Sequence, residues 1–143
     1  MPIESVVADA NVLLSAITGK AALRVFTEFE VTVHIAKFNV NEVVEYLPEM
    51  AAQYDLTTEF LEMQWKLLPI QVHAEEDYHR YLNQALANLA KRDPEDAHAL
   101  ALARKLGVPL WSNDRDLAGL GVECYPTARL LAALKKERRA VRD

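Results

Sequence analysis

The sequence has few of the residues that form covalent or metal-based cross-links. Cys124 is the only cysteine among 143 residues. A single cysteine excludes a disulfide within the chain and any zinc site built on paired cysteines. We therefore expect the chain to work in a reducing compartment and to rely on its hydrophobic core for stability.

Features of secretion and of membrane insertion are also lacking. The first fifteen residues contain Glu4 and Asp9 but no lysine or arginine, so they do not resemble a secretory signal. No apolar run approaches the roughly 18 residues that a membrane-spanning helix needs. These absences predict a cytoplasmic protein with no membrane association.

The chain has no excess of positive charge. Its 16 lysines and arginines stand against 21 aspartates and glutamates, which gives a formal net charge of −5. This balance argues against a protein that binds nucleic acid mainly through bulk positive charge. The charge is unevenly placed, however, because residues 135–143 carry +3 and residues 1–134 carry −8.

What is present is the composition of one folded domain. Hydrophobic residues make up 51% of the chain and charged residues 26%, close to the average of soluble globular domains. A chain of this length buries roughly 68–70% of its unfolded surface. No repeat, low-complexity stretch or Pro/Gly-rich linker divides it. We predict a single domain over residues 1–134, followed by a basic helix end or tail over residues 135–143.

Short β-branched segments alternate with helical ones along the chain. The predicted strands are residues 3–8, 31–35, 70–72, 108–111 and 123–125. The predicted helices are residues 12–29 with a break at Gly19, 38–47 up to Pro48, 57–68, 74–89, 93–106 and 127–139. This alternation predicts the α/β class, with a mostly parallel sheet covered by helices on both faces.

Four acidic residues occur where a predicted strand gives way to a loop or helix, or early in a helix. They are Asp9, Glu42, Asp96 and Asp114. Ligand sites of parallel α/β sheets gather at the carboxyl ends of the strands, so these acids can converge although about a hundred residues separate them. Convergent carboxylates repel one another and need a cation, and a set of oxygen ligands favours Mg²⁺ or Mn²⁺.

Each acid taken alone also has a purely structural interpretation. Asp9 is suited to cap the helix that follows it, and Asp114 is suited to form a turn. Asp93 precedes Pro94, which is the pattern of a helix N-cap. Asp96 lies in the first turn of the same helix, so we prefer Asp96 to Asp93 as the ligand.

Three blocks of the sequence resemble the signature blocks of PIN-domain proteins, in the same order and at similar spacing. They read VVADANVLLSA, FNVNEVVEYL and RDPEDAHALALARKLGVPLWSNDRDL. The third block is the most specific, because an Asp-Pro-x-Asp helix start, an alanine- and leucine-rich helix, a strand ending in Trp111 and Ser-Asn-Asp-x-Asp follow one another. The similarity covers residues 5 to about 134, although residues 48–90 carry no motif that matches the family.

The resemblance implies a three-layer α/β/α sandwich and a metal-dependent endoribonuclease that hydrolyses RNA phosphodiester bonds. In bacteria and archaea, such a protein is often the VapC-type toxin of a toxin–antitoxin pair. The resemblance therefore implies Mg²⁺ or Mn²⁺ as cofactor, RNA as substrate, a protein antitoxin as partner and a homodimer as the assembly.

The resemblance also implies roles for individual residues. The family's catalytic acidic quartet is matched by Asp9, Glu42, Asp96 and Asp114. An accessory acid is matched by Asp116, and the implied metal ligands are Asp9, Asp96, Asp114 and Asp116. Asn11 and Ser112 match polar residues that support the site.

Contacts with RNA are predicted only weakly. Arg115 lies beside the acids and is suited to a phosphate contact, but we prefer the interpretation of a solvated turn arginine. The tail offers four further basic residues: Lys135, Lys136, Arg138 and Arg139. Their alternative role is that of a solvated helix end, where positive charge is favoured by the helix dipole.

An apolar stripe in the helix predicted at 57–68 has two interpretations. Phe60, Leu61, Met63 and Trp65 lie at helical spacing after Leu56, which is more often the pattern of a core face. The same stripe, if exposed, would suit a dimer interface or an antitoxin.

Two other functions compete with the nuclease. One is a catalytically silent PIN-like binding module that acts through a protein or RNA partner. The other is a phosphatase or phosphotransfer receiver on a similar sheet. The second lacks support, because Asp9-Ala10-Asn11 has no second acid and no lysine follows Leu110-Trp111.

Overall fold

The strands form one parallel sheet. The structure is a computed structural model that describes residues 2–89 and 96–142. The sheet has the order β3-β2-β1-β4-β5, and every pairing is parallel. The strands are β1 (Ser5–Ala8), β2 (Thr32–Ala36), β3 (Ile70–His73), β4 (Leu110–Trp111) and β5 (Cys124–Tyr125). The central position of β1 places its end, and the residue that follows it, in the middle of the sheet.

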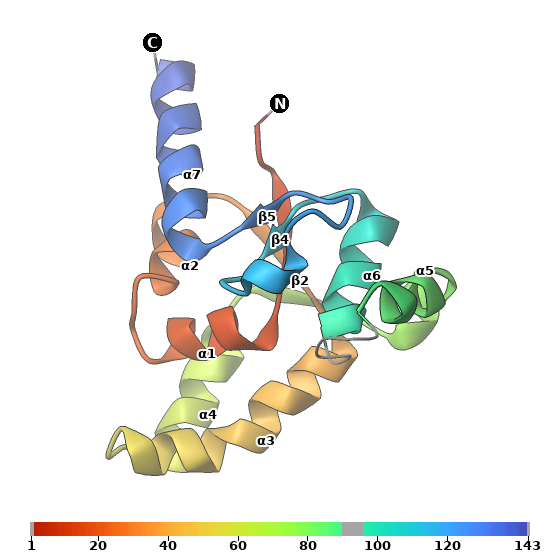
Figure 1. The fold of residues 1–143 in the computed structure, drawn as a ribbon. Helices are drawn as coiled ribbons and strands as arrows, with labels where there is room; N and C mark the ends of the chain where they lie inside the picture. Colours follow the sequence, from red (N-terminus) through yellow and green to blue (C-terminus); the bar gives the residue numbers. More distant parts are fainter. Residues whose placement is uncertain (1, 90–95, 143) are drawn as a thin grey trace.

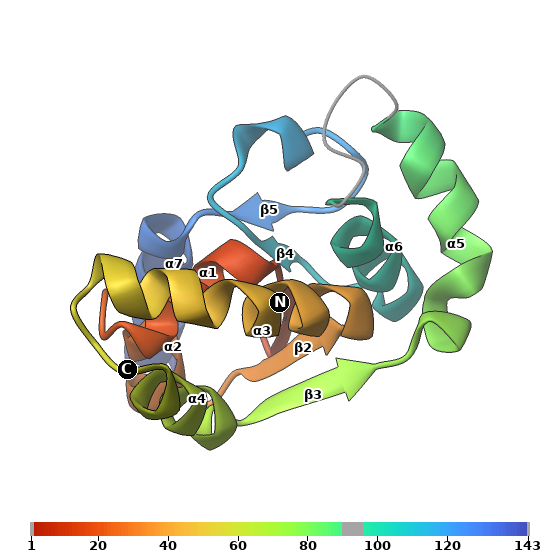
Figure 2. The ribbon, with the colours of Figure 1, turned by 90° about the horizontal axis from the view of Figure 1, so that it is seen from below.

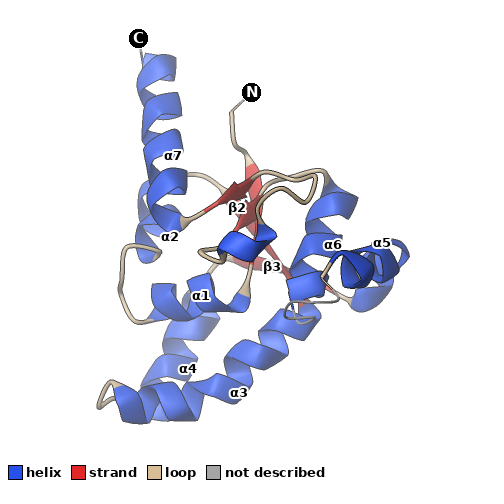
Figure 3. Cartoon of the chain, viewed as in Figure 1, coloured by secondary structure: helices blue, strands red, loops and turns tan. Residues whose placement is uncertain are grey.

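Helices connect the strands and cover both faces of the sheet. The helices are α1 (Ala10–Ile17), α2 (Leu23–Glu28), α3 (Lys37–Gln53), α4 (Thr58–Leu67), α5 (Glu75–Asn88), α6 (Ala97–Leu106) and α7 (Thr127–Arg142), with a short 3₁₀ helix η2 (Arg115–Leu117). Figure 3 shows the strands enclosed by helices, and Figure 2 shows α5 and α6 on the opposite side of the sheet from α1, α2 and α7. The predicted three-layer α/β/α sandwich is confirmed.

Alternating side chains of the strands divide the core into two halves. Val6 belongs to the buried cluster of α1, α3 and α7, whereas its neighbour Val7 belongs to the cluster of α5 and α6. Successive residues of a strand point to opposite faces, so each face of β1 supplies one half of the core. The central strand β1 is therefore covered on both faces, as is usual in a parallel sheet.

Local sequence signals explain most element boundaries. Thr57 caps α4 by accepting a hydrogen bond from the backbone N–H of Phe60 at 3.1 Å. Gly107 ends α6 with φ of 67°, a left-handed conformation that glycine adopts at little cost. The predicted helix start at Asp93 lies outside the described residues.

The predicted end of a helix at Pro48 is wrong, because α3 continues to Gln53. A proline within a helix lacks the N–H that would bond to the carbonyl four residues earlier, here that of Val44. Both residues are exposed, so water can replace the missing bond. Leu47 and Met50 are buried, and their packing keeps the helix intact.

The basic tail is the continuation of α7. It lies near the start of β1, whereas Asp9 follows the end of that strand. Glu137 of α7 accepts hydrogen bonds from the backbone N–H of Ile3, with the shorter at 3.0 Å. Six residues of extended chain, about 20 Å, separate Ile3 from Asp9. Figure 1 shows α7 rising away from the starts of α1 and α3.

No helix within residues 2–89 and 96–142 has both the length and the apolar character needed to cross a membrane.

Candidate active site

Asp9 follows β1 directly and caps α1. Its Oδ1 accepts a hydrogen bond from the backbone N–H of Val12 at 3.0 Å, which satisfies one of the unpaired donors of a helix start. The capping role predicted for Asp9 is therefore observed. It does not use the whole carboxylate, because the second oxygen faces Ser112.

Ser112 joins Asp9 to the segment that follows β4. Its hydroxyl donates to Oδ2 of Asp9, and its Oγ accepts from the backbone N–H of Asp114 at 3.0 Å. Asp9 is 5% exposed and Ser112 is fully buried. One serine thus fixes two segments that lie 103 residues apart in the sequence.

The carboxylate of Asp9 is held in an unfavourable electrostatic environment. Burial raises its pKa, and the nearby charge of Asp114 raises it further, while hydrogen bonds from Ser112 and Val12 act in the opposite direction. Burial is also the main cause that raises the pKa of the Cys124 thiol, to which both acids contribute. Both acids therefore act on one region beside Ser112, where a cation would relieve their repulsion.

Asp114 and Asp116 form the tight turn that sequence reasoning considered. Oδ1 of Asp114 accepts from the backbone N–H of Asp116 at 2.9 Å and starts η2. Asn113 is directed elsewhere, because its Oδ1 accepts from the backbone N–H of Thr127 at the start of α7. The turn fixes the backbone beside Asp9. It uses only Oδ1 of Asp114 as an acceptor.

Glu42 lies on the second turn of α3, beside a buried polar residue that sequence reasoning missed. The amide nitrogen of Asn39 donates to Oε1 of Glu42 at 2.6 Å. Asn39 is only 3% exposed, and its Oδ1 has no hydrogen-bond partner among the described residues. The spacing of Asn39 and Glu42 could have indicated this contact, since residues three apart lie on the same face of a helix. A buried carbonyl oxygen without a donor is suited to a cation or its water.

Asp96 immediately precedes α6, next to the start of α3. Two residues later, His98 stacks on Phe38 with ring centroids 4.0 Å apart and planes 4° from parallel. The hydroxyl of Tyr78 lies 2.8 Å from Nδ1 of the same histidine. These contacts bring the first turns of α3 and α6 together, and with them the segments that carry Glu42 and Asp96.

The starts of α1, α3 and α6 lie at the same end of the sheet as η2 (Figure 1). Asp9 and Asp114 are thus brought together, and Glu42 and Asp96 lie on neighbouring segments. Asn11 contributes its backbone to Asp9, and its side chain is exposed. Arg115 is exposed in η2, whereas the tail with Lys135, Lys136, Arg138 and Arg139 lies at the other edge.

The donor set fits a hard divalent cation held by few protein ligands. Within residues 2–89 and 96–142, no three His, Cys, Asp or Glu side chains are grouped closely enough to hold a metal ion by themselves. Mg²⁺ keeps several waters and is usually bound through one or two carboxylates together with substrate phosphate. The pair Asp9 and Asp114 meets that requirement. The unpartnered oxygen of Asn39, beside Glu42, is a donor of the same chemical type.

Solved structures of known proteins share the fold of this chain. A protein of Pyrobaculum aerophilum, PAE2754, has 20% identity and a TM-score of 0.66, over 94% of this chain and 90% of its own. A toxin–antitoxin complex from Klebsiella pneumoniae contains a chain with 18% identity and a TM-score of 0.64, over 85% of this chain and 97% of its own.

A third similar structure is VapC20 of Mycobacterium tuberculosis, described as a toxin that cleaves the sarcin-ricin loop. Its identity is 19% and its TM-score 0.59, over 85% of this chain and 99% of its own. Curated proteins give no significant match. A family model described as PIN domain matches residues 7–135. The match includes most of the sheet and all five candidate acids, which are Asp9, Glu42, Asp96, Asp114 and Asp116. The chain belongs to the PIN-domain family.

Proposed function

We propose that this chain is a divalent-metal-dependent endoribonuclease that hydrolyses RNA phosphodiester bonds. The observation that supports it best is the buried carboxylate of Asp9, linked through Ser112 to Asp114 at the carboxyl edge of a PIN-domain sheet. Burying a carboxylate beside a second acid costs stability. Such an arrangement is expected where a cation compensates for the cost during function.

The roles that we assign follow the position of each acid. Asp9 and Asp114 would hold the cation, with Asp96 and Asp116 completing the ligand set directly or through water. Glu42 would orient the attacking water from the side of α3. When bound, Mg²⁺ or Mn²⁺ supplies a Lewis acid that lowers the pKa of water and neutralises charge on the phosphate.

Ser112 is a positioning residue in this proposal. Its hydroxyl holds Oδ2 of Asp9, and its Oγ holds the backbone that carries Asp114. Both carboxylates therefore keep a fixed separation before any cation binds. Preorganised charge of this kind costs no reorganisation when the reaction occurs.

RNA as the substrate and an antitoxin as the partner are supported by the similar structures. One of them is described as cleaving the sarcin-ricin loop, and another is a toxin–antitoxin complex. The α4 stripe, defined as Leu56, Phe60, Met63 and Leu67, is exposed, whereas Leu61 is buried. An exposed stripe of this kind suits a protein partner, and we propose an antitoxin or a second copy of this chain as its occupant.

Cleavage of mixed RNA by the purified protein tests the proposal. We expect cleavage with Mg²⁺ or Mn²⁺, none with EDTA, and none by Asp9→Asn with either ion. Asp77→Asn is the matched control, because Asp77 is an exposed aspartate on the first turn of α5. The control should cut RNA at the wild-type rate.

Wild-type protein that leaves RNA intact with both ions would refute the nuclease. In that case the alternative, a catalytically silent PIN-like binding module, would be favoured if RNA or a protein partner still binds. Equal activity of wild type and Asp9→Asn would refute the assignment of Asp9.

A further inference from the structure

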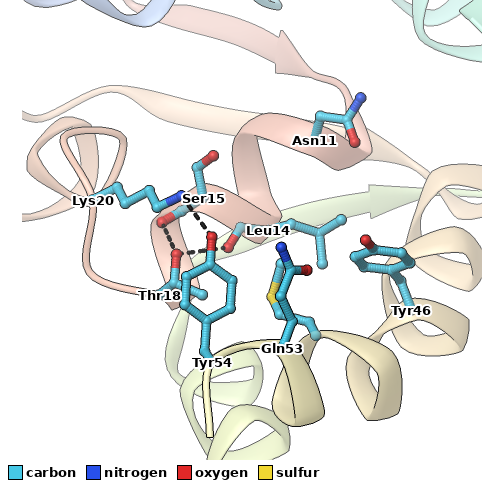
Figure 4. Close-up of a pocket in the computed structure, with 9 residues that line it drawn as sticks. Asn11, Leu14, Ser15, Thr18, Lys20, Tyr46, Gln53 and Tyr54 are labelled. Carbon is cyan, nitrogen blue, oxygen red and sulfur yellow. Dashed lines mark hydrogen bonds between the residues drawn. The ribbon is translucent and has the colours of Figure 1, made fainter. Parts of the chain in front are cut away.

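A small polar pocket lies between α1 and α3 (Figure 4). Its volume is about 290 Å³, at the lower end of the range for pockets that bind small ligands. Leu14 and Met50 form apolar parts of its lining, and both are buried. None of the roles assigned above to the acids uses this pocket.

The pocket begins at the first turn of α1, close in sequence to Asp9, and extends along that helix. Asn11, two residues after Asp9, lines one end of it, and Thr18 and Lys20 line the other. Seven residues of helix, about 10 Å, separate Asn11 from Thr18. A linear ligand that reaches Asp9 can therefore continue into this pocket.

Lys20 gives the pocket a single positive charge. Its Nζ donates a hydrogen bond to the hydroxyl of Tyr54 at 2.7 Å and lies 5.1 Å from the centre of that ring. All residues that line the pocket are described, and none of them is acidic. This part of the surface attracts an anion, in contrast to the neighbouring acids.

Tyr46 presents a ring that lacks a partner. Its side chain is 37% exposed, and no aromatic ring or cation among the described residues lies against it. Gln53 lines the pocket between Tyr46 and Tyr54 (Figure 4). The pocket thus combines a free aromatic face with an amide that can both donate and accept hydrogen bonds.

We propose that this pocket binds one nucleotide of a single-stranded RNA, next to the phosphate that lies at the acids. A base stacks on Tyr46, its edge meets the amide of Gln53, and a backbone phosphate meets Lys20. Sequence-tolerant binding of single strands combines these elements, a stacking ring and a cation along the backbone. This inference rests on the proposed function and names how the same substrate is held.

The pocket favours RNA over a peptide segment of a protein partner. The acids beside it need a phosphodiester at that end, and the chain as a whole carries −5. A basic anchor is therefore required near the acids to retain a polyanion. The basic tail instead lies near Ile3, before the start of β1, whereas Asp9 follows the end of that strand. Lys20 provides such an anchor on the side where the pocket lies.

Binding without cleavage provides the test. We would measure the affinity of fluorescent single-stranded RNA oligonucleotides for the full chain in EDTA, by anisotropy, across a series of salt concentrations. Tyr46→Ala should weaken binding roughly five- to a hundred-fold with little change of the salt slope, since stacking carries no charge. Tyr46→Phe, which keeps the ring, should stay within about three-fold of wild type.

Lys20→Gln should weaken binding and reduce the salt slope by about 0.7, the value for one phosphate contact on a single strand. Tyr81→Ala and Lys66→Gln are the matched controls. Tyr81 is also 37% exposed but lies on α5, and Lys66 is exposed at the end of α4. Both should bind as wild type.

The outcomes separate this inference from the proposed function. If Tyr46→Ala and Lys20→Gln bind RNA as wild type, the inference is overturned even where cleavage with Mg²⁺ persists. The same holds if they keep RNA binding and lose a protein partner instead. If the pocket variants lose RNA while wild type binds RNA but never cuts it, the inference stands and the nuclease does not.

Discussion

Removal of the Ser112 hydroxyl tests the link at the centre of the site. Ser112→Ala removes a hydrogen bond to the carboxylate of Asp9 and leaves the backbone N–H of Asp114 without its acceptor. A hydrogen bond to a charged group contributes about 1.5–3 kcal/mol and a neutral one about 0.5–1.5 kcal/mol. We expect a loss of about 2–4 kcal/mol in the free energy of unfolding.

Chemical and thermal unfolding in EDTA would measure this loss. At roughly 4 °C per kcal/mol for a domain of this size, Tm should fall by roughly 8–16 °C. Ser5→Ala is the control, since Ser5 lies in the same sheet at the start of β1, and its substitution should change stability by less than about 0.5 kcal/mol.

A double-mutant cycle shows whether the loss comes from Asp9. In the Asp9→Asn protein the buried charge is gone, so Ser112→Ala should cost at least about 1 kcal/mol less than in wild type. Equal costs in both backgrounds would show that Ser112 does not act through Asp9. A loss below about 1 kcal/mol in wild type would refute the link itself.

Three further predictions concern the same scaffold. Burial raises the pKa of Asp9 above 3.8, so between the two pKa values the folded state binds a proton that the unfolded state releases. The free energy of unfolding in EDTA should therefore fall as pH rises from about 4 through the raised pKa. Asp9→Asn should flatten this dependence in unfolding curves. Thr127→Val removes the acceptor of the buried Trp111 Nε1–H at 2.9 Å and should cost about 1–3 kcal/mol by urea denaturation, with Thr127→Ser retaining most of the stability. Changing Lys135, Lys136 and Arg139 to Ala should lower the affinity and the salt slope only for RNA long enough to reach from the acids to the tail, and it should not alter the Tm rise that Mg²⁺ produces. Wild-type binding of such RNA across a salt series would show that the tail is only a solvated helix end.

Arg138 is kept in that variant because it has a structural role. Its Nη1 donates to the backbone carbonyl of Glu28 at 2.9 Å, and its guanidinium lies 4.6 Å from the centre of the Phe29 ring. Its removal would loosen α7 from the end of α2. The sequence predicted the same phosphate contact for Arg138 as for its basic neighbours. It could not distinguish them, because only the fold shows which side of α7 packs against α2.

The sequence by itself determined the class of fold. The alternation of β-branched segments with helical ones favours a parallel sheet, since a helix between two strands can return the chain to the end of the sheet where the first strand began. Asp9 could be assigned to a helix start, because capping depends on neighbouring residues alone. The acids were predicted to converge because each lies near the carboxyl end of a strand or at the start of a helix, and in a parallel sheet those ends lie on one side.

Only the tertiary structure decided which of these residues meet. The contact of Ser112 with Asp9 depends on β4 lying beside β1, and strand order is not a property of any local segment. The pocket depends in the same way on the packing of α1 against α3, which brings Lys20 to Tyr54, 34 residues away. Pro48 stays within a helix because its side of α3 faces water, and the basic tail lies far from Asp9 because α7 runs back along the sheet. Such non-local contacts arise when separate elements pack into one core, so a pattern read along the chain does not contain them.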